Sequence, residues 1–229
     1  MMIMALKSTG RFNMEHAKNL SDAAFGCLLG ALVGDAAGAT LEFMGRQPSD
    51  AEVEHAMKMP GGGVWRVAPG QVTDDGELTL CLAHGLTEMG GTFQIEKSAQ
   101  KYADWVRSQP FDIGNTTSRS LGCFWWPKWQ PICQTEGYAV GMAQAAAERC
   151  MGSKANGSLM RASPLGIWGH RLSDDQLAQF AIADSSLSHP NPSCCHAVAC
   201  YVIAIANLLR KPADRQLAWF VRNLWLIIK

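Results

Sequence analysis

Apolar residues recur along most of this chain with the period of about 3.6 residues that marks an amphipathic α-helix. The clearest case is residues 75–89, where Leu78, Leu82 and Leu86 fall on one face and Gly90 follows the helix. No convincing alternation of apolar and polar residues indicates a strand. The sequence therefore predicts an all-α fold. Further helices are expected at 95–108, 136–150, 174–186, 193–209 and 212–229, with shorter ones near 50–59 and after Asn115.

The first predicted helix begins at Ser21 and Asp22 and carries a glycine every four residues, at positions 26, 30, 34 and 38. That spacing places the glycines along one side of the helix. Each glycine costs about 1 kcal/mol relative to alanine in a helix interior. We therefore expect a neighbouring helix to approach closely and the first helix to be buried almost all round. Asp35 and Glu42 lie near its C-terminal end, where the helix dipole disfavours negative charge. Either a functional site requires these two acids there, or both are simply exposed to solvent at the helix end.

The same patterns suggest the domain organisation. Residues 1–20 are predicted to be a flexible N-terminal tail, and residues 21–229 a single compact multi-helix domain. The tail is too polar after Leu6 for a signal peptide. Residues 23–43 are interrupted by Asp35 and Glu42, which argues against a membrane span. The glycine- and proline-rich segment 44–72 is long for a connection in a compact domain, which is typical of a lid or binding loop.

Composition narrows the class of protein. The chain has 229 residues, is 48% hydrophobic and 17% charged, and has a formal net charge of zero from 20 basic and 20 acidic residues. We therefore expect neither a nucleic acid nor a membrane as partner. The eight cysteines include no C-x-x-C pair, and several lie in apolar helical surroundings. This usage favours a reducing, cytoplasmic location over a disulfide framework.

The stretch with the most distinctive chemistry is Thr73-Asp74-Asp75, at the start of the helix over 75–89. It places a hydroxyl and two carboxylates side by side, an arrangement that a hard divalent cation such as Mg²⁺ would stabilise. Thr and Asp are also common N-cap residues, and Glu77 would add favourable charge in the first turn. Considered alone, the stretch favours a helix cap over a metal site, because caps are far more common.

Other constellations are weaker. His196 and Cys200 are spaced for a zinc pair on a helix, but no second ligand pair matches them, so core packing explains them better. Gly157 and Ser158 lack the second glycine of a nucleophile elbow. The aromatic loop 124–131, FWWPKWQP, could stack on a base, fill the core or meet a partner protein.

Five stretches, in this order, resemble the ADP-ribosylglycohydrolase family, which includes dinitrogenase reductase-activating glycohydrolases and ADP-ribosylarginine hydrolases. They run from residue 23 to about residue 209: GCLLGALVGDAAGATLEF, VTDDGELTL, FDIGNTTSRSL, NGSLMRASPLG and SLSHPNP. The resemblance implies a helical domain with two divalent metals, Mg²⁺ or Mn²⁺, at the base of an ADP-ribose cleft. It implies hydrolysis of the N- or O-glycosidic bond between ADP-ribose and a modified protein side chain, arginine above all. The partner would be an ADP-ribosylated protein or ADP-ribose itself.

The resemblance also implies roles for individual residues. Thr73, Asp74 and Asp75 match metal ligands, and Glu42 and Asp112 are the two candidate catalytic bases, which the sequence does not separate. The implied substrate-binding residues are Gly114, Asn115, Thr116, Asn156, Gly157, Ser158, Met160, Arg161 and His189.

One departure from the family concerns the C-terminal part. The family carries a second acidic cluster, Asp-x-Asp-Thr/Ser, whereas Asp214 is the only acid after Pro212 here. We therefore expect a C-terminally shortened domain in which metal binding and turnover are impaired. The alternatives are a relative that binds ADP-ribose or metal without efficient turnover, and a helical protein-interaction module. Uncovered apolar helix faces, including that of 194–209, would favour a homodimer. Gly76 is a smaller departure, since many family members have Thr or Ser there.

Overall fold

The computed structural model describes residues 2–211 of the chain, and their side chains from residue 19 onward. Across residues 2–211 no strand forms beyond one isolated bridge between Gly62 and Val67, which confirms the all-α prediction. The elements are α1 (Met2–Gly38), α2 (Asp50–Ala56), α3 (Asp74–Thr87), α4 (Ile95–Arg107), α5 (Asn115–Leu121), a 3₁₀ turn (Cys123–Trp125), α6 (Gln130–Thr135), α7 (Tyr138–Arg149), α8 (Ser163–Trp168), α9 (Asp174–Ser186) and α10 (Pro192–Arg210). The predicted helix 212–229 lies outside the described residues.

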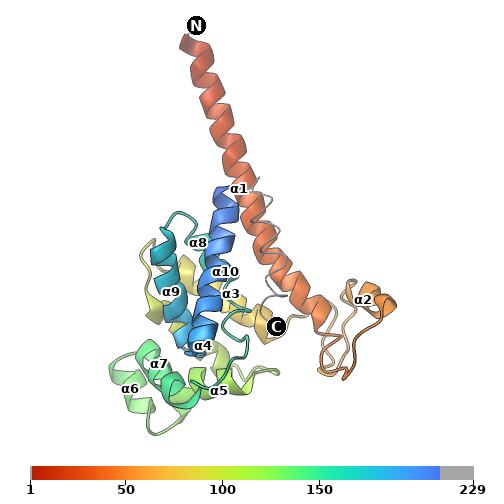
Figure 1. The fold of residues 1–229 in the computed structure, drawn as a ribbon, viewed down its shortest axis with the longest axis vertical. Helices are drawn as coiled ribbons and strands as arrows, with labels where there is room; N and C mark the ends of the chain where they lie inside the picture. Colours follow the sequence, from red (N-terminus) through yellow and green to blue (C-terminus); the bar gives the residue numbers. More distant parts are fainter. Residues whose placement is uncertain (1, 212–229) are drawn as a thin grey trace.

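The core lies between α3, α4, α7, α8, α9 and α10. α3 packs against α4 and α8, and α10 packs against α8 and α9. Figure 1 shows α9 and α10 side by side, with α5, α6 and α7 gathered at one end of the bundle. The core faces carry fully buried Leu78, Tyr102, Leu165 and Val198. For α3, where Leu78, Leu82 and Leu86 are all buried, the apolar periodicity identified the inward face correctly.

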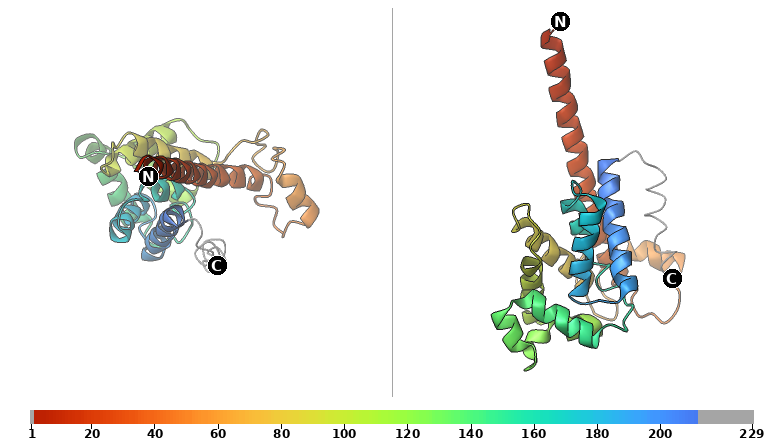
Figure 2. Two further views of the ribbon diagram at one scale, coloured as in Figure 1. Left: turned by 90° about the horizontal axis from the view of Figure 1, so that it is seen from above. Right: turned by 60° about the vertical axis from the view of Figure 1, so that its left-hand side comes forward.

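The first helix differs from the prediction in two ways. It begins at Met2, and its N-terminal half extends beyond the other helices (Figures 1 and 2). Apart from the backbone of α1 itself and the adjoining residues, no described atom would lie within 4 Å of a Cβ placed at Gly26, Gly30, Gly34 or Gly38. Phe25 and Leu29 are exposed as well. The expected close helix neighbour and all-round burial were therefore wrong for the described residues, while the flexibility of residues 1–20 stays a prediction.

Two helical stretches, Asn19–Gly38 and Pro192–Arg210, are long and apolar enough to cross a membrane on length and composition alone. α10 places Val198, Val202 and Ala206 in the core, so packing explains its apolar character. Only 11% of the stretch in α1 is buried. The predicted absence of a membrane partner therefore stays a prediction.

The aromatic loop divides between core and surface. Phe124 and Trp129 are buried, whereas Trp125 and Trp126 are exposed. The guanidinium of Arg149 lies 4.4 Å from the centre of the Trp126 ring. Part of the loop thus fills the core, and its two central tryptophans face outward.

Candidate active site

A cavity of about 210 Å³ opens where the ends of several helices meet. Its walls come from the segment after α1, the first turn of α3, the segment leading into α5, the loop before α8 and the segment after α9. The lining residues are Glu42, Phe43, Asp74, Asp75, Asp112, Gly114, Asn115, Thr116, Thr117, Ala155, Asn156, Gly157, Met160 and His189. Both candidate bases, two of the three predicted metal ligands and seven of the nine predicted substrate-binding residues are therefore brought together.

Four carboxylates form one wall of this cavity: Glu42, Asp74, Asp75 and Asp112. Burial, then the charges of Asp112 and Asp75, raise the pKa of Asp74 to about 7. Burial, then the charges of Asp35 and Glu42, raise the pKa of Asp75 to about 6. Burial also raises the pKa of Glu42 and of Asp112. Burial and mutual repulsion thus disfavour the charged forms of these acids, and such perturbed pKa values are typical of functional sites.

The first turn of α3 is held by a residue that the family resemblance did not assign. Asp35 of α1 accepts hydrogen bonds from the backbone N–H groups of Thr73 and Gly76, at 2.9 and 2.7 Å, and from the Thr73 hydroxyl, at 2.7 Å. The Thr73 side chain itself makes no capping bond. Asp35 is therefore the acceptor for the α3 N-terminus, where the helix dipole favours a carboxylate.

This contact explains why an acid lies at the C-terminal end of α1. It is unfavourable for the dipole of α1 but favourable for that of α3, which only the packing of the two helices reveals. The signal in the sequence was the acid at the wrong helix end. The contact with Asp35 also changes the interpretation of Thr73, which was predicted to be a metal ligand. Thr73 is fully buried, hydrogen-bonded to Asp35 and absent from the cavity lining.

Gly76 has a steric reason in the same contact. A Cβ at this position would lie 2.6 Å from Asp35 Oδ2 and 2.6 Å from Val72 Cβ. Carbon atoms in contact are normally about 3.5–4.0 Å apart. With Asp35 and Val72 in these positions, no side chain fits at position 76.

The loop 44–72 contributes an aromatic support to the acidic wall. Five of its glycines adopt positive φ, at 45, 61, 62, 63 and 70, and a Cβ at Gly63 would lie 2.9 Å from the Ala39 carbonyl oxygen. Trp65 donates its indole N–H to Glu42 Oε2 at 2.9 Å. Its ring makes edge contacts with Phe43 and Phe111. The long loop therefore fixes the orientation of one candidate base.

The rest of the cavity lining is uncharged and contains hydrogen-bonding groups. It includes Asn115, Asn156 and His189, together with Gly157. A Cβ at Gly157 would lie 2.6 Å from His189 Cε1 and 3.0 Å from Thr117 Oγ1. The glycine therefore allows the imidazole ring to approach the loop before α8.

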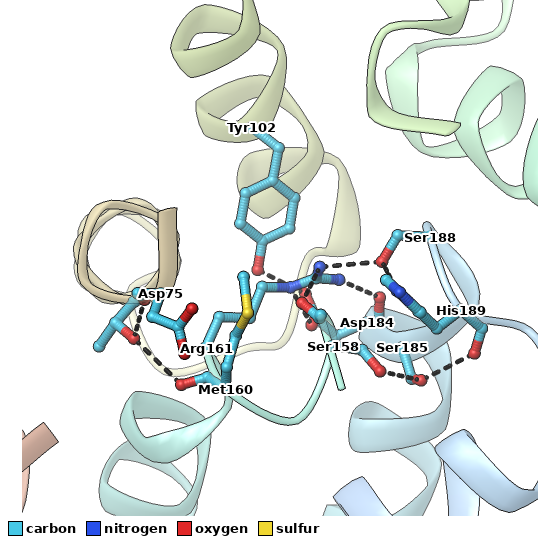
Figure 3. Close-up of polar contacts among 11 residues, drawn as sticks. Asp75, Tyr102, Ser158, Met160, Arg161, Asp184, Ser185, Ser188 and His189 are labelled. Atoms are coloured by element: carbon cyan, nitrogen blue, oxygen red, sulfur yellow. Dashed lines mark hydrogen bonds and ion pairs between the residues drawn. The ribbon is translucent and has the colours of Figure 1, made fainter. Parts of the chain in front are cut away.

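Ser158 and Arg161 were expected to contact a ligand, but the structure places both behind the cavity. Arg161 is fully buried and donates from Nε to Asp184 Oδ2 at 3.1 Å and from Nη2 to the Asp184 carbonyl at 2.9 Å. Its guanidinium lies 4.6 Å from the Tyr102 ring centre, and Tyr102 donates to Asp184 Oδ1 at 2.8 Å. Ser158 is bonded to Ser185. Figure 3 shows these groups as one connected network. A buried guanidinium needs such partners, so it is not free to bind a ligand.

A family model described as ADP-ribosylglycohydrolase matches residues 16–225. The chain belongs to the ADP-ribosylglycohydrolase family.

Individual relatives agree with this assignment. The ADP-ribosyl-(dinitrogen reductase) glycohydrolase of Rhodospirillum rubrum is 33% identical over 176 residues, which cover 76% of this chain and 53% of the relative. The ADP-ribosylarginine hydrolase Tri1 of Serratia proteamaculans is 36% identical over 137 residues, covering 54% of this chain and 35% of Tri1. A solved structure named as an ADP-ribosylglycohydrolase-related protein complex matches with a TM-score of 0.65 and 29% identity, over 89% of this chain and 62% of that one. The chain spans about half the length of the first two curated relatives it matches.

The ADP-ribosylglycohydrolase family implies divalent metals, and the acidic wall can be compared with that requirement. Its donors are all carboxylate oxygens, which suit a hard cation such as Mg²⁺ or Mn²⁺. Asp74, Asp75, Glu42 and Asp112 are the residues that would hold it. Among the described residues, however, no group of three or more His, Cys, Asp or Glu is already arranged around an ion position. The donor chemistry fits, and the remaining oxygen ligands would come from water or substrate.

Proposed function

We propose that this protein hydrolyses the glycosidic bond between ADP-ribose and a modified protein side chain, with arginine as the first candidate, and that Mg²⁺ or Mn²⁺ is required. The observation that carries the proposal is the composition of one cavity. Four carboxylates and several neutral hydrogen-bonding groups line it. ADP-ribose has phosphate and ribose oxygens that accept hydrogen bonds from donors in the site. The ribose carbon of the glycosidic bond becomes positively charged as that bond breaks, and neighbouring carboxylates stabilise this charge.

The residues of the chain would share the chemistry as follows. Glu42 or Asp112 takes a proton from the attacking water, since a raised pKa makes a carboxylate a stronger base near neutral pH. The neighbouring carboxylates stabilise the positive charge that develops on the ribose as the bond to the side chain breaks. A bound Mg²⁺ or Mn²⁺ would supply charge neutralisation and orient oxygen atoms at the acidic wall.

Release of ADP-ribose from an ADP-ribosylarginine protein tests this function. We expect release with Mg²⁺ or Mn²⁺ and loss of release with a chelator. Asp74→Asn and Asp75→Asn should each lower the rate at least about a hundredfold, because each removes a charge at the reacting ribose. Asp175→Asn on the exposed first turn of α9 is the matched control and should retain the wild-type rate. Comparing Glu42→Gln with Asp112→Asn identifies the base, which should show the larger loss in kcat.

One observation favours a second candidate, an ADP-ribose-binding protein without efficient turnover. The described residues contain no preformed group of three metal ligands. Calorimetry with free ADP-ribose separates the two candidates. Binding without release at saturating Mg²⁺ favours this second function, and a lack of both binding and release contradicts both.

We also propose a reducing compartment, namely the cytoplasm, and self-association. All eight cysteines are free thiols, which supports the first point. Exposed Phe25 and Leu29 on α1 support a homodimer through this helix. Light scattering on the full chain tests the homodimer, and a monomer at all concentrations would contradict it.

A further inference from the structure

A chain of buried hydrogen bonds leads from Arg161 to His189 (Figure 3), and His189 lines the cavity. Arg161 Nη1 lies 2.9 Å from Ser188 Oγ and 3.1 Å from the carbonyl oxygen of Gly157. Ser188 Oγ in turn lies 2.9 Å from Nδ1 of His189. Arg161, Ser188 and His189 are each at most 1% exposed. The order of the chain is therefore guanidinium, hydroxyl and imidazole, with only the imidazole at the cavity.

The direction of the first bond is set by chemistry, because a guanidinium has donors and no acceptor. Ser188 Oγ must accept from Arg161, and its own hydrogen remains available for one further bond. The Nδ1 atom of His189 is the other polar atom recorded beside this hydroxyl in the described residues. If Nδ1 carried a hydrogen, the buried serine hydrogen would have no acceptor, which is unfavourable.

We propose that Arg161, acting through Ser188, holds His189 in the neutral tautomer that carries its hydrogen on Nε2, so that His189 donates to a ligand oxygen and does not serve as a base. With Nδ1 accepting from Ser188, the single ring hydrogen resides on Nε2. Arg161 is then a positioning residue for His189, in place of the direct ligand contact expected from the sequence.

The ring edge that carries Nε2 is the edge beside the cavity. A Cβ at Gly157, which lines the cavity, would lie 2.6 Å from His189 Cε1 and 3.0 Å from Nε2. Burial and the charge of Arg161 lower the pKa of His189 to about 4, which keeps the ring neutral. The position of the Nε2 edge and the lowered pKa thus both agree with His189 as a neutral hydrogen-bond donor.

The Nε2–H group of His189 would donate its hydrogen bond to an oxygen atom of the ligand. This part of the inference rests on the proposed function, in which the cavity binds ADP-ribose, and it assigns His189 to a phosphate or ribose oxygen. The four carboxylates line the same cavity, so the imidazole and the acids have different tasks in it. His189 binds and orients, while proton transfer from water belongs to the acids.

Nuclear magnetic resonance of the ring nitrogens tests the tautomer in the free protein. The chain has six histidines, and loss of one signal in His189→Gln assigns the ring of interest. At neutral pH we expect a protonated Nε2 and an unprotonated Nδ1. Ser188→Ala should shift this ring towards a mixture of tautomers. Ser98→Ala is the matched control, since Ser98 is buried and its hydroxyl has no partner among the described residues.

A wild-type ring with hydrogen on Nδ1, or with both nitrogens protonated, would overturn the inference. So would an unchanged tautomer in Ser188→Ala. The use of Ser188→Ala keeps the Arg161–Asp184 ion pair, whereas Arg161→Ala would leave a buried carboxylate alone.

Binding of free ADP-ribose tests the donor. His189→Gln keeps an N–H donor near the position of Nε2 and should bind within about threefold of wild type, whereas His189→Leu should bind about tenfold more weakly. Equal weakening in both variants would contradict a donor role. If wild-type protein does not bind ADP-ribose, the proposed function and the assigned ligand fail together, while the ring signals of the free protein still decide the tautomer.

Discussion

Replacement of Gly76 by alanine offers a sharp test of how the acidic wall is built. The added Cβ would lie 2.6 Å from Asp35 Oδ2 and 2.6 Å from Val72 Cβ, about 1 Å closer than ordinary contact allows. Asp35 or the first turn of α3 must therefore move. Either movement stretches the hydrogen bonds from Thr73 and Gly76 to the Asp35 carboxylate.

The expected magnitude follows from these two effects. Overpacking by one methyl group costs about 1–3 kcal/mol, and a hydrogen bond to a charged group contributes about 1.5–3 kcal/mol. The better helix propensity of alanine offsets about 1 kcal/mol. We expect Gly76→Ala to lower the free energy of unfolding by about 2–4 kcal/mol, measured by urea denaturation followed by circular dichroism.

The variant Gly30→Ala is the matched control. Outside the backbone of α1 and the adjoining residues no described atom would lie within 4 Å of its Cβ, so the propensity gain should raise stability by up to about 1 kcal/mol. A double-mutant cycle with Asp35→Ala locates the clash, and we expect a coupling of at least about 1 kcal/mol because the two residues touch. A Gly76→Ala variant as stable as wild type, within about 0.5 kcal/mol, would refute the assigned role of Asp35.

Three further predictions follow from the buried polar groups. Because the folded-state pKa values of Asp74 and Asp75 are raised to about 7 and about 6, their protonated forms are favoured by folding. Their contribution to stability, about 1–2 kcal/mol after allowance for solvent, should be full below about pH 4 and lost as the pH rises through about 6–7. The melting temperature without metal should fall over that window, and the fall should be absent in the Asp74→Asn/Asp75→Asn double variant. Tyr102→Phe removes a donor to buried Asp184 and should lower the free energy of unfolding by about 1–3 kcal/mol in a denaturant titration. Gly157→Ala pushes a methyl group against the His189 ring and should weaken ADP-ribose binding about tenfold or more by calorimetry, whereas exposed Gly152→Ala should match wild type.

Local patterns predicted the helices well because most of them are amphipathic and bury one face. The repeat of Leu78, Leu82 and Leu86 was enough to place the core face of α3. The same local signals misjudged α1, whose small residues suggested a close neighbour that the described residues do not supply. A glycine stripe shows that close approach is allowed, and it does not show that a neighbour is present.

The candidate site was predictable in membership but not in roles. The family resemblance implied Glu42, Asp74, Asp75 and Asp112 as one site, and the cavity contains all four. Motif spacing does not say which polar residue faces the cavity and which lies behind it. Arg161 is a single residue in a promising motif, yet its partners Tyr102 and Asp184 lie far away in the sequence.

By itself the sequence determined the helical class, which is written in residue spacing along single segments. Its motifs also resembled a family that implies the set of acids the cavity collects. Only the tertiary structure decided that Asp35 caps α3, that Gly76 leaves room for it, and that Arg161 supports His189 from within the core. The physical reason is the same in each case. Capping, steric exclusion and the pairing of a buried charge depend on atoms from distant segments that become neighbours only when the helices pack.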